Sequence, residues 1–364
     1  MISQKFPFPP RIRAMMARGV VEGVFPGGVL AVWHAGKTFL EAFGWRTYLP
    51  HPLRNEEDVF YDLASLTKPL ATTLCLMRLV EEEGLSLSAP LAHFLETPPW
   101  WKEARLFHLL AHCAGFPAHR PYFARLITKP LAERRTLFLR LVLHESPAYP
   151  LGQKHVYSDL GFFVLGEILQ LVSGKALDLL FEETRRLLGL EGLLFKPLAA
   201  GLVREETAAT EVCPWRGKLI WGEVHDENTW VLGGVAGQAG LFGQAEAVLA
   251  LLLLLLQAYK GELERAFLKR DLLRTFWDWQ SPHGTWALGF DRPDPQNSSA
   301  GEMISRRAVG HLGFTGTSFW VDVDHELIVV LLTNRVHPER FPNKLAAFRP
   351  VLHDLVFKEM VSQS

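Results

Sequence analysis

The segment at residues 62–73, DLASLTKPLATT, decides how the whole sequence is interpreted. Ser65 and Lys68 are three residues apart, and residues with that spacing share one face of a helix, so the lysine Nζ can reach the serine hydroxyl. Pro69 lacks an amide donor, which a helix tolerates in its first turn but not in its interior. We therefore expect a helix to begin close to Ser65. Because Lys68 precedes a proline, which disfavours α geometry, we expect a distorted first turn.

A serine hydroxyl is a weak nucleophile until a base takes its proton. Lys68 can be that base only if burial or the positive potential of a helix amino terminus lowers its pKa. The alternative interpretation is that Ser65 caps a helix and Lys68 is a solvated surface residue. The spacing alone does not decide between the two, so companion motifs are needed.

Two companions follow in order along the chain. Tyr157 and Asp159 come directly before the helical run LGFFVLGEIL, where a tyrosine in a loop can place its phenol beside Ser65 and relay a proton. The stretch 310–317, GHLGFTGT, then leads into the expected strand SFWVDVD. Such a glycine-rich strand edge lets a substrate backbone approach closely.

This ordered set, Ser-x-x-Lys, Tyr-x-Asp and His-x-Gly, resembles the penicillin-binding protein and class C β-lactamase superfamily of active-site serine hydrolases. The resemblance extends from about Gly27 to Asn334, through FHLLAHCAGFP and GEVHDENTWVLGGVAGQAGLF. It implies that Ser65 attacks a carbonyl group, that Lys68 and Tyr157 move its proton to the leaving group, and that water releases the acyl-enzyme. It also implies an oxyanion between the backbone N–H groups of Ser65 and Phe314. The remaining residues that it places at the substrate are Asp159, His311, Gly313 and Thr315.

Two positions depart from the lactamase pattern. Asp159 stands where lactamases usually carry Asn, and an ionised carboxylate only accepts hydrogen bonds and favours a protonated Lys68 unless it points away. His311 stands where lactamases usually carry Lys, and an unperturbed imidazole is mostly uncharged at neutral pH. Its attraction for a substrate carboxylate should be weak. Efficient β-lactamase activity is therefore not expected.

The hydrophobic pattern predicts an α+β fold. Strands are expected at Gly28–Trp33 and Thr38–Phe43, joined by a tight turn, and again in TWALGF, TSFWVDVD and ELIVVLLTN. The middle of the chain has helical spacing, including a buried helix around the leucine run at 247–256, and a last helix is expected at 343–360. Because no βαβ alternation occurs, the pattern indicates an antiparallel sheet built from both chain ends and flanked by helices.

The resemblance specifies this fold further as β-lactamase/transpeptidase-like, with one catalytic domain over residues 1–364. We expect an α/β subdomain from residues 1–62 and 283–364. A mainly helical subdomain, residues 63–282, is expected to carry Ser65 and Tyr157 at the interface.

Composition restricts the partners. The chain has 364 residues, 38 Lys and Arg against 39 Asp and Glu, and no basic surplus for nucleic acid. The longest apolar run is shorter than the roughly 20 residues of a membrane span, and the amino terminus lacks a secretory signal pattern, so a cytoplasmic location is expected. Three cysteines without close spacing predict reduced thiols. The sequence leaves the oligomeric state open.

The sequence therefore predicts a serine hydrolase that acts through an acyl-serine on an amide or ester of a small molecule or short peptide, with a peptidoglycan-derived peptide expected. Alternatives are a carboxylesterase, a weak β-lactamase or D,D-peptidase, and a non-catalytic relative. No cofactor and no metal are expected, although His108, His112 and His225 are the candidates for a metallohydrolase. Aromatic residues that either line a cleft or fill the core are Phe314, Trp215, Trp221 and Trp230.

Overall fold

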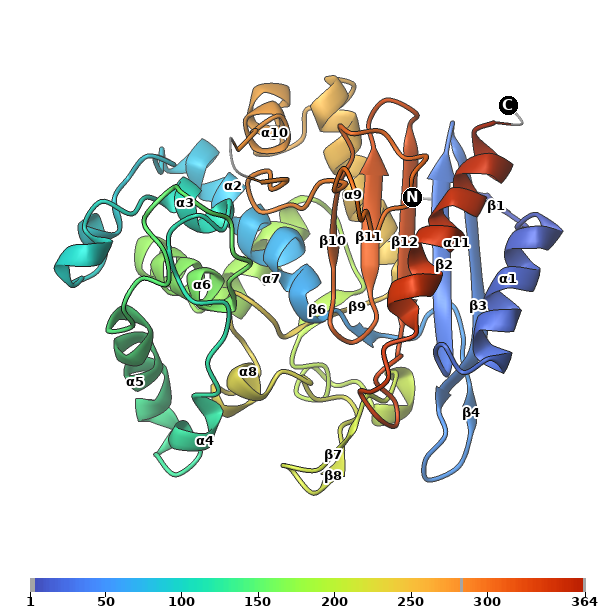
Figure 1. Cartoon of the computed structure of the whole chain (residues 1–364), viewed down its shortest axis with the longest axis horizontal. Coiled ribbons are helices and arrows are strands. Elements are labelled where there is room, and N and C mark those ends of the chain that lie inside the picture. The colour runs from blue at the N-terminus through green and yellow to red at the C-terminus, as the bar shows by residue number, and fades with distance from the viewer. Residues whose placement is uncertain (1–3, 282–283, 363–364) are drawn as a thin grey trace.

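A seven-stranded sheet joins the two ends of the chain in the computed structural model, which describes residues 4–281 and 284–362 (Figure 1). The strand order is β1-β3-β2-β12-β11-β10, and β4 pairs with β3. All pairs are antiparallel except β1 with β3. The expected sheet from both chain ends is thus confirmed, with one short parallel pair that the pattern did not indicate.

The strands are β1 (Lys5–Phe6), β2 (Gly27–His34), β3 (Lys37–Thr47), β4 (Leu53–Arg54), β5 (Tyr61–Asp62), β6 (Leu193–Phe195), β7 (Val212–Cys213), β8 (Lys218–Leu219), β9 (Leu241–Gly243), β10 (Val309–Leu312), β11 (Ser318–Asp322) and β12 (Leu327–Thr333). The helices are α1 (Pro10–Val21), α2 (Leu74–Glu82), α3 (Leu106–Leu110), α4 (Phe123–Leu126), α5 (Leu131–Leu143), α6 (Asp159–Ser173), α7 (Leu177–Leu187), α8 (Glu227–Val231), α9 (Ala245–Lys260), α10 (Arg270–Trp277) and α11 (Leu345–Met360).

The central strand β2 is buried on both faces. Val29 and Ala31 belong to the large core that continues into the helical region, whereas Leu30 and Val32 belong to a second core. Helices α1 and α11 cover this second face, and α9, which carries the leucine run, lies against β2 and β12 on the other (Figure 1). Successive side chains of a strand point to opposite faces, so one apolar strand serves both cores.

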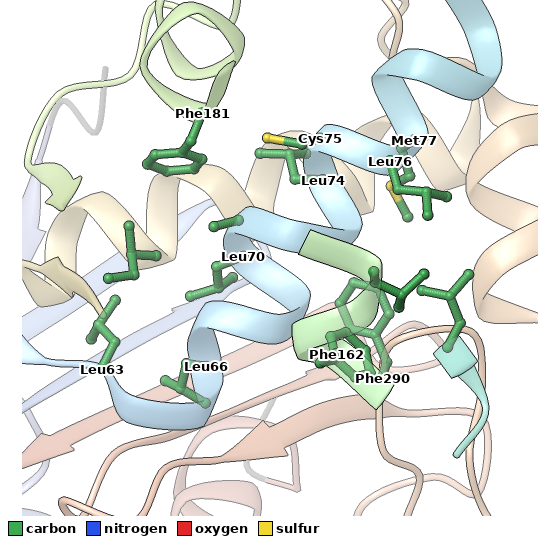
Figure 2. Packing of buried hydrophobic residues seen from close by; sticks show 14 of the residues in the cluster. Leu63, Leu66, Leu70, Leu74, Cys75, Leu76, Met77, Phe162, Phe181 and Phe290 are labelled. Atoms are coloured by element: carbon green, nitrogen blue, oxygen red, sulfur yellow. The ribbon is translucent and has the colours of Figure 1, made fainter. Parts of the chain in front are cut away.

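The helix after Ser65 begins irregularly, as the proline predicted. A 3₁₀ turn at Ala64–Leu66 leads into a π-helical turn at Lys68–Thr73, and only then does α2 begin. Leu66, Leu70 and Leu74 are buried along this segment, near Phe162 of α6 (Figure 2). This packing fixes the direction in which Ser65 and Lys68 point.

Some features of the fold differ from the expectations. The segment 285–290, TWALGF, is not a strand: it turns at Gly289, whose φ is 82°, and Ala287 N–H donates to Phe290 O. The large side chains of this segment pack in the core and at the cavity. Their spacing along the sequence resembles that of a strand, although the backbone turns. Two small sheets, β5-β9-β6 and β7-β8, were not expected. The proposed subdomain boundary between residues 282 and 283 lies outside the described residues.

Within the described chain, no single helix is long and apolar enough to cross a membrane, and one pair, α6 with α7, passes that test only by combining two helices bent by 75°. Cys75, Cys113 and Cys213 are buried free thiols.

Candidate active site

Ser65 lies on a strained turn that Asp62 holds. Ala64, directly before it, has a φ of 48°, in the left-handed region that a residue with a Cβ adopts at a cost of about 1–2 kcal/mol. The buried Asp62 carboxylate accepts the Ala64 N–H at 2.8 Å and the His225 N–H at 2.6 Å. One carboxylate therefore ties the serine turn to a distant loop and compensates for the backbone strain.

Lys68 is fully buried and joins the predicted catalytic residues. Its Nζ is 3.1 Å from Ser65 Oγ, 2.6 Å from Tyr157 Oη, 2.7 Å from Asp159 Oδ1 and 3.1 Å from Gln238 O. An ammonium group has three hydrogens, and the carboxylate and the carbonyl can only accept. Two hydrogens are thus committed to Asp159 and Gln238. Ser65 and Tyr157 share the third.

Lys68 does not have the lowered pKa that a lysine needs to act as a base at neutral pH. Burial alone would lower its pKa, but the Asp159 carboxylate and Tyr157 outweigh burial and raise the pKa above the ordinary value. Asp159 points toward the lysine rather than away. The sequence made a protonated Lys68 depend on whether Asp159 points away, and in the resting site the carboxylate is ionised and adjacent, so the lysine keeps its proton.

The other two groups of the cluster also hold definite protonation states. Burial raises the pKa of Tyr157 to about 12, although Lys68 acts in the opposite direction. Burial would raise the pKa of Asp159, yet Lys68 and His119 hold it well below its usual range. His119 Nδ1 lies 3.5 Å from Asp159 Oδ2. At neutral pH the resting cluster is an ammonium, a carboxylate and a neutral phenol.

The turn after β10 packs directly on the serine turn. A Cβ on Gly313 would lie 2.0 Å from Thr317 Oγ1 and 2.7 Å from Leu63 O, so only glycine permits this approach. Thr315 is 1% exposed and its hydroxyl donates to Asp62 O at 2.7 Å. The expected substrate contact of Thr315 is thus replaced by an internal one, because its hydroxyl is committed to holding the two turns together.

A cavity of about 610 Å³ opens over these residues. Ser65, Tyr157, Asp159, His311, Gly313 and Phe314 all line it, so the structure brings these predicted site residues together. The Phe314 side chain is 46% exposed and stacks on His225, with ring centroids 5.5 Å apart. Trp215 and Trp230 instead pack on each other, and Trp221 is buried with its Nε1 donating to Thr207 O.

Several residues that line the cavity were not predicted from the sequence. Trp286 belongs to the segment expected to be a strand. Gln238 lies in the segment GEVHDENTWVLGGVAGQAGLF, and its buried Oε1 has no hydrogen-bond partner within the described part of the chain. Arg335 and Arg349 also line it, and neither has a carboxylate partner among the described residues. Arg349 is 6% exposed, and burial lowers its pKa to about 10. Only the fold brings these residues beside Ser65.

The histidines considered as metal ligands have other partners. His225 Nε2 lies 3.1 Å from Glu211 Oε2, and Glu211 also pairs with Arg340. His108 Nδ1 accepts the Arg105 N–H, and His112 Nδ1 accepts the Ser158 N–H. Over residues 4–281 and 284–362, no group of three or more His, Cys, Asp or Glu side chains has the proximity to hold a metal ion.

The sheet from both chain ends, with a partly buried Ser-Lys-Tyr cluster under a cavity, defines a β-lactamase/transpeptidase-like fold. Residues 11–351 match the family model described as Beta-lactamase. The chain belongs to the β-lactamase family. A relative from Salmonella paratyphi B, named "Putative D-alanyl-D-alanine carboxypeptidase", is 29% identical over 327 residues, which cover 82% of this chain and 74% of the relative.

Solved structures show the same fold. "EstCE1, a hydrolase with promiscuous acyltransferase activity" superposes with a TM-score of 0.73 and 21% identity, over 95% of this chain and 97% of that one. The octameric penicillin-binding protein homologue from Pyrococcus abyssi superposes with a TM-score of 0.71 and 20% identity, over 96% and 78% of the two chains. At these identities the likeness concerns the fold.

Proposed function

We propose that this chain is a serine hydrolase that cleaves an amide bond of a short peptide through an acyl-enzyme on Ser65. The observation that carries the proposal is the position of Lys68 Nζ, 3.1 Å from Ser65 Oγ and 2.6 Å from Tyr157 Oη. A packing role alone does not require a nucleophile, a buried ammonium and a buried phenol to share hydrogen bonds beneath a cavity.

In the acylation step, a bond forms between Ser65 Oγ and the carbonyl carbon while the carbon–nitrogen bond breaks. The serine proton passes through Tyr157 and Lys68 to the leaving nitrogen. Water then attacks the acyl carbon, and the bond from that carbon to Ser65 Oγ breaks. The hydroxyl of the water completes the acid product, and its second hydrogen goes to Ser65 Oγ. Because both Lys68 and Tyr157 hold their protons at neutral pH, the reactive form is the one in which the cluster has lost a proton. The acylation rate should therefore rise with pH.

The oxyanion that forms in each step needs hydrogen-bond donors beside Ser65. The backbone N–H of Ser65 and that of Phe314 are the proposed pair, since Phe314 follows Gly313 on the turn that packs on Leu63 O. Removal of one such donor typically costs about 10²–10³ in rate.

The arginines support a peptide with a free carboxylate as substrate. Arg335 and Arg349 bring two positive charges to the cavity without a carboxylate partner among the described residues. A carboxylate of the substrate would supply the missing partner. The relative's name, which includes D-alanyl-D-alanine carboxypeptidase, supports the same substrate class.

The test is intact-protein mass spectrometry after incubation with a fluorophosphonate, followed by assay of a muropeptide mixture, nitrocefin and p-nitrophenyl butyrate. We expect a phosphonate adduct in the wild type and in Ser88→Ala, a control at an exposed serine, but none in Ser65→Ala. Muropeptide cleavage should likewise depend on Ser65. An adduct that persists in Ser65→Ala would overturn the proposal. Hydrolysis of the butyrate without cleavage of any peptide would favour an esterase.

A further inference from the structure

His311 has one paired and one unpaired ring nitrogen. Its Nδ1 lies 2.8 Å from Leu312 O, and because a carbonyl oxygen only accepts, Nδ1 carries the hydrogen. Its Nε2 is buried and has no hydrogen-bond partner among the described residues. A buried polar atom without a partner costs free energy, and such atoms in folded proteins call for an explanation.

The ring is neutral, so Nε2 presents a lone pair. Burial and the nearby Lys68 ammonium lower the pKa of His311 to about 3. An imidazole with that pKa is too weak a base to take a proton at neutral pH, yet its lone pair still accepts a hydrogen bond. His311 therefore suits a ligand group that carries a hydrogen and does not suit a carboxylate.

The position of His311 indicates which ligand group this is. It lies on β10 and lines the cavity together with Ser65. Its ring centroid is 5.8 Å from that of Tyr157, the residue proposed to pass a proton to the leaving group. A leaving group that receives this proton would lie in the part of the cavity that Tyr157 and His311 both line. The leaving nitrogen of a peptide carries a hydrogen of its own, whereas the leaving oxygen of an ester carries none.

We propose that His311 Nε2 accepts the N–H of the scissile amide and thereby favours amides over esters in this site. This inference rests on the proposed function. As the bond to the carbonyl carbon weakens, the nitrogen develops a lone pair that must face the proton donor. With its hydrogen held by His311, that lone pair faces Tyr157. An ester leaves Nε2 unpaired in the transition state.

The test compares two substrates that differ only in the scissile group, N-acetyl-D-alanyl-D-alanine and N-acetyl-D-alanyl-D-lactate. His311→Leu should lower kcat/KM for the peptide about tenfold more than for the ester, the usual effect of one lost hydrogen bond. His311→Gln should recover part of the peptide rate, because its side-chain oxygen can accept. Fluorophosphonate labelling of Ser65 should persist in both variants.

Equal losses on the two substrates would show a structural role for His311 and overturn the inference. Wild-type activity on the ester alone, or on neither compound, would also overturn it. If Ser65 labelling persists in these cases, the acyl-serine step of the proposed function still holds, and only its specificity for amides fails. As an independent check, NMR of the ¹⁵N-labelled protein should show the His311 hydrogen on Nδ1, and a hydrogen on Nε2 would remove the basis of the inference.

Discussion

Replacing Asp159 by Asn tests whether this carboxylate sets the pH at which Ser65 becomes reactive. Asp159 Oδ1 lies 2.7 Å from a fully buried Lys68 Nζ, and its own side chain is 23% exposed. An opposite charge at this range typically shifts a pKa by about 1–3 units, equivalent to about 1.4–4 kcal/mol. The carboxylate raises the pKa of Lys68, so its removal should lower that pKa, and burial then acts in the same direction.

The assay is the rate of fluorophosphonate labelling of Ser65 as a function of pH. In the wild type, the proton-poor form of the cluster accumulates only at alkaline pH. In Asp159→Asn, the rising limb of the profile should move down by about one to three pH units. Asp226→Asn is the matched control, since Asp226 lines the same cavity but accepts from Thr229 N. A profile that stays in place or moves upward in Asp159→Asn would refute the reasoning.

Three further predictions concern the turn, the loop and the cavity wall. Gly313→Ala should slow labelling of Ser65 at least tenfold, because its Cβ would lie 2.7 Å from Leu63 O, whereas Gly161→Ala, with its nearest neighbour at 3.8 Å, should not. Glu211→Gln should lower the free energy of unfolding by urea at pH 7. Hydrogen bonds from His225 and Arg340 outweigh burial and hold the pKa of Glu211 at about 2. The difference in stability between wild type and variant should therefore vanish as pH falls from about 4.5 toward 2. Burial raises the pKa of Asp291 to about 7, so ionisation of this carboxyl should destabilise the protein as pH rises from about 4 to 7. The melting temperature of Asp291→Asn should therefore exceed that of the wild type at pH 8 but not at pH 4.5.

Local patterns predicted much of this site because each rests on short-range geometry. The spacing of Ser65 and Lys68 requires only one helical turn, and Pro69 marks where that helix begins. The hairpin of β2 and β3 follows from two short strand-like runs and from Gly36 between them, whose φ of 82° suits a tight turn. These features are decided within a few residues, so the fold around them does not change their interpretation.

Predictions failed where a residue's partner is distant in sequence. Thr315 was expected at the substrate, but its hydroxyl is committed to Asp62 O, 253 positions away in the chain. Trp286 was expected in a strand, but it lies at the cavity beside His112 and Tyr157. Arg349, on the carboxyl-terminal helix, gave no sequence signal, because an arginine near the end of a chain is ordinary until the fold buries it without a carboxylate.

The sequence by itself determined which groups meet at the candidate site: a serine and lysine on one turn, a tyrosine, and a histidine and glycine at a strand edge, in an α+β chain. Only the tertiary structure decided their charges. Lys68 is an ammonium because Asp159 points at it, and His311 is a neutral acceptor because it is buried with Nδ1 committed to Leu312 O. A protonation state depends on burial and on charges within a few ångströms, and sequence order does not specify those distances.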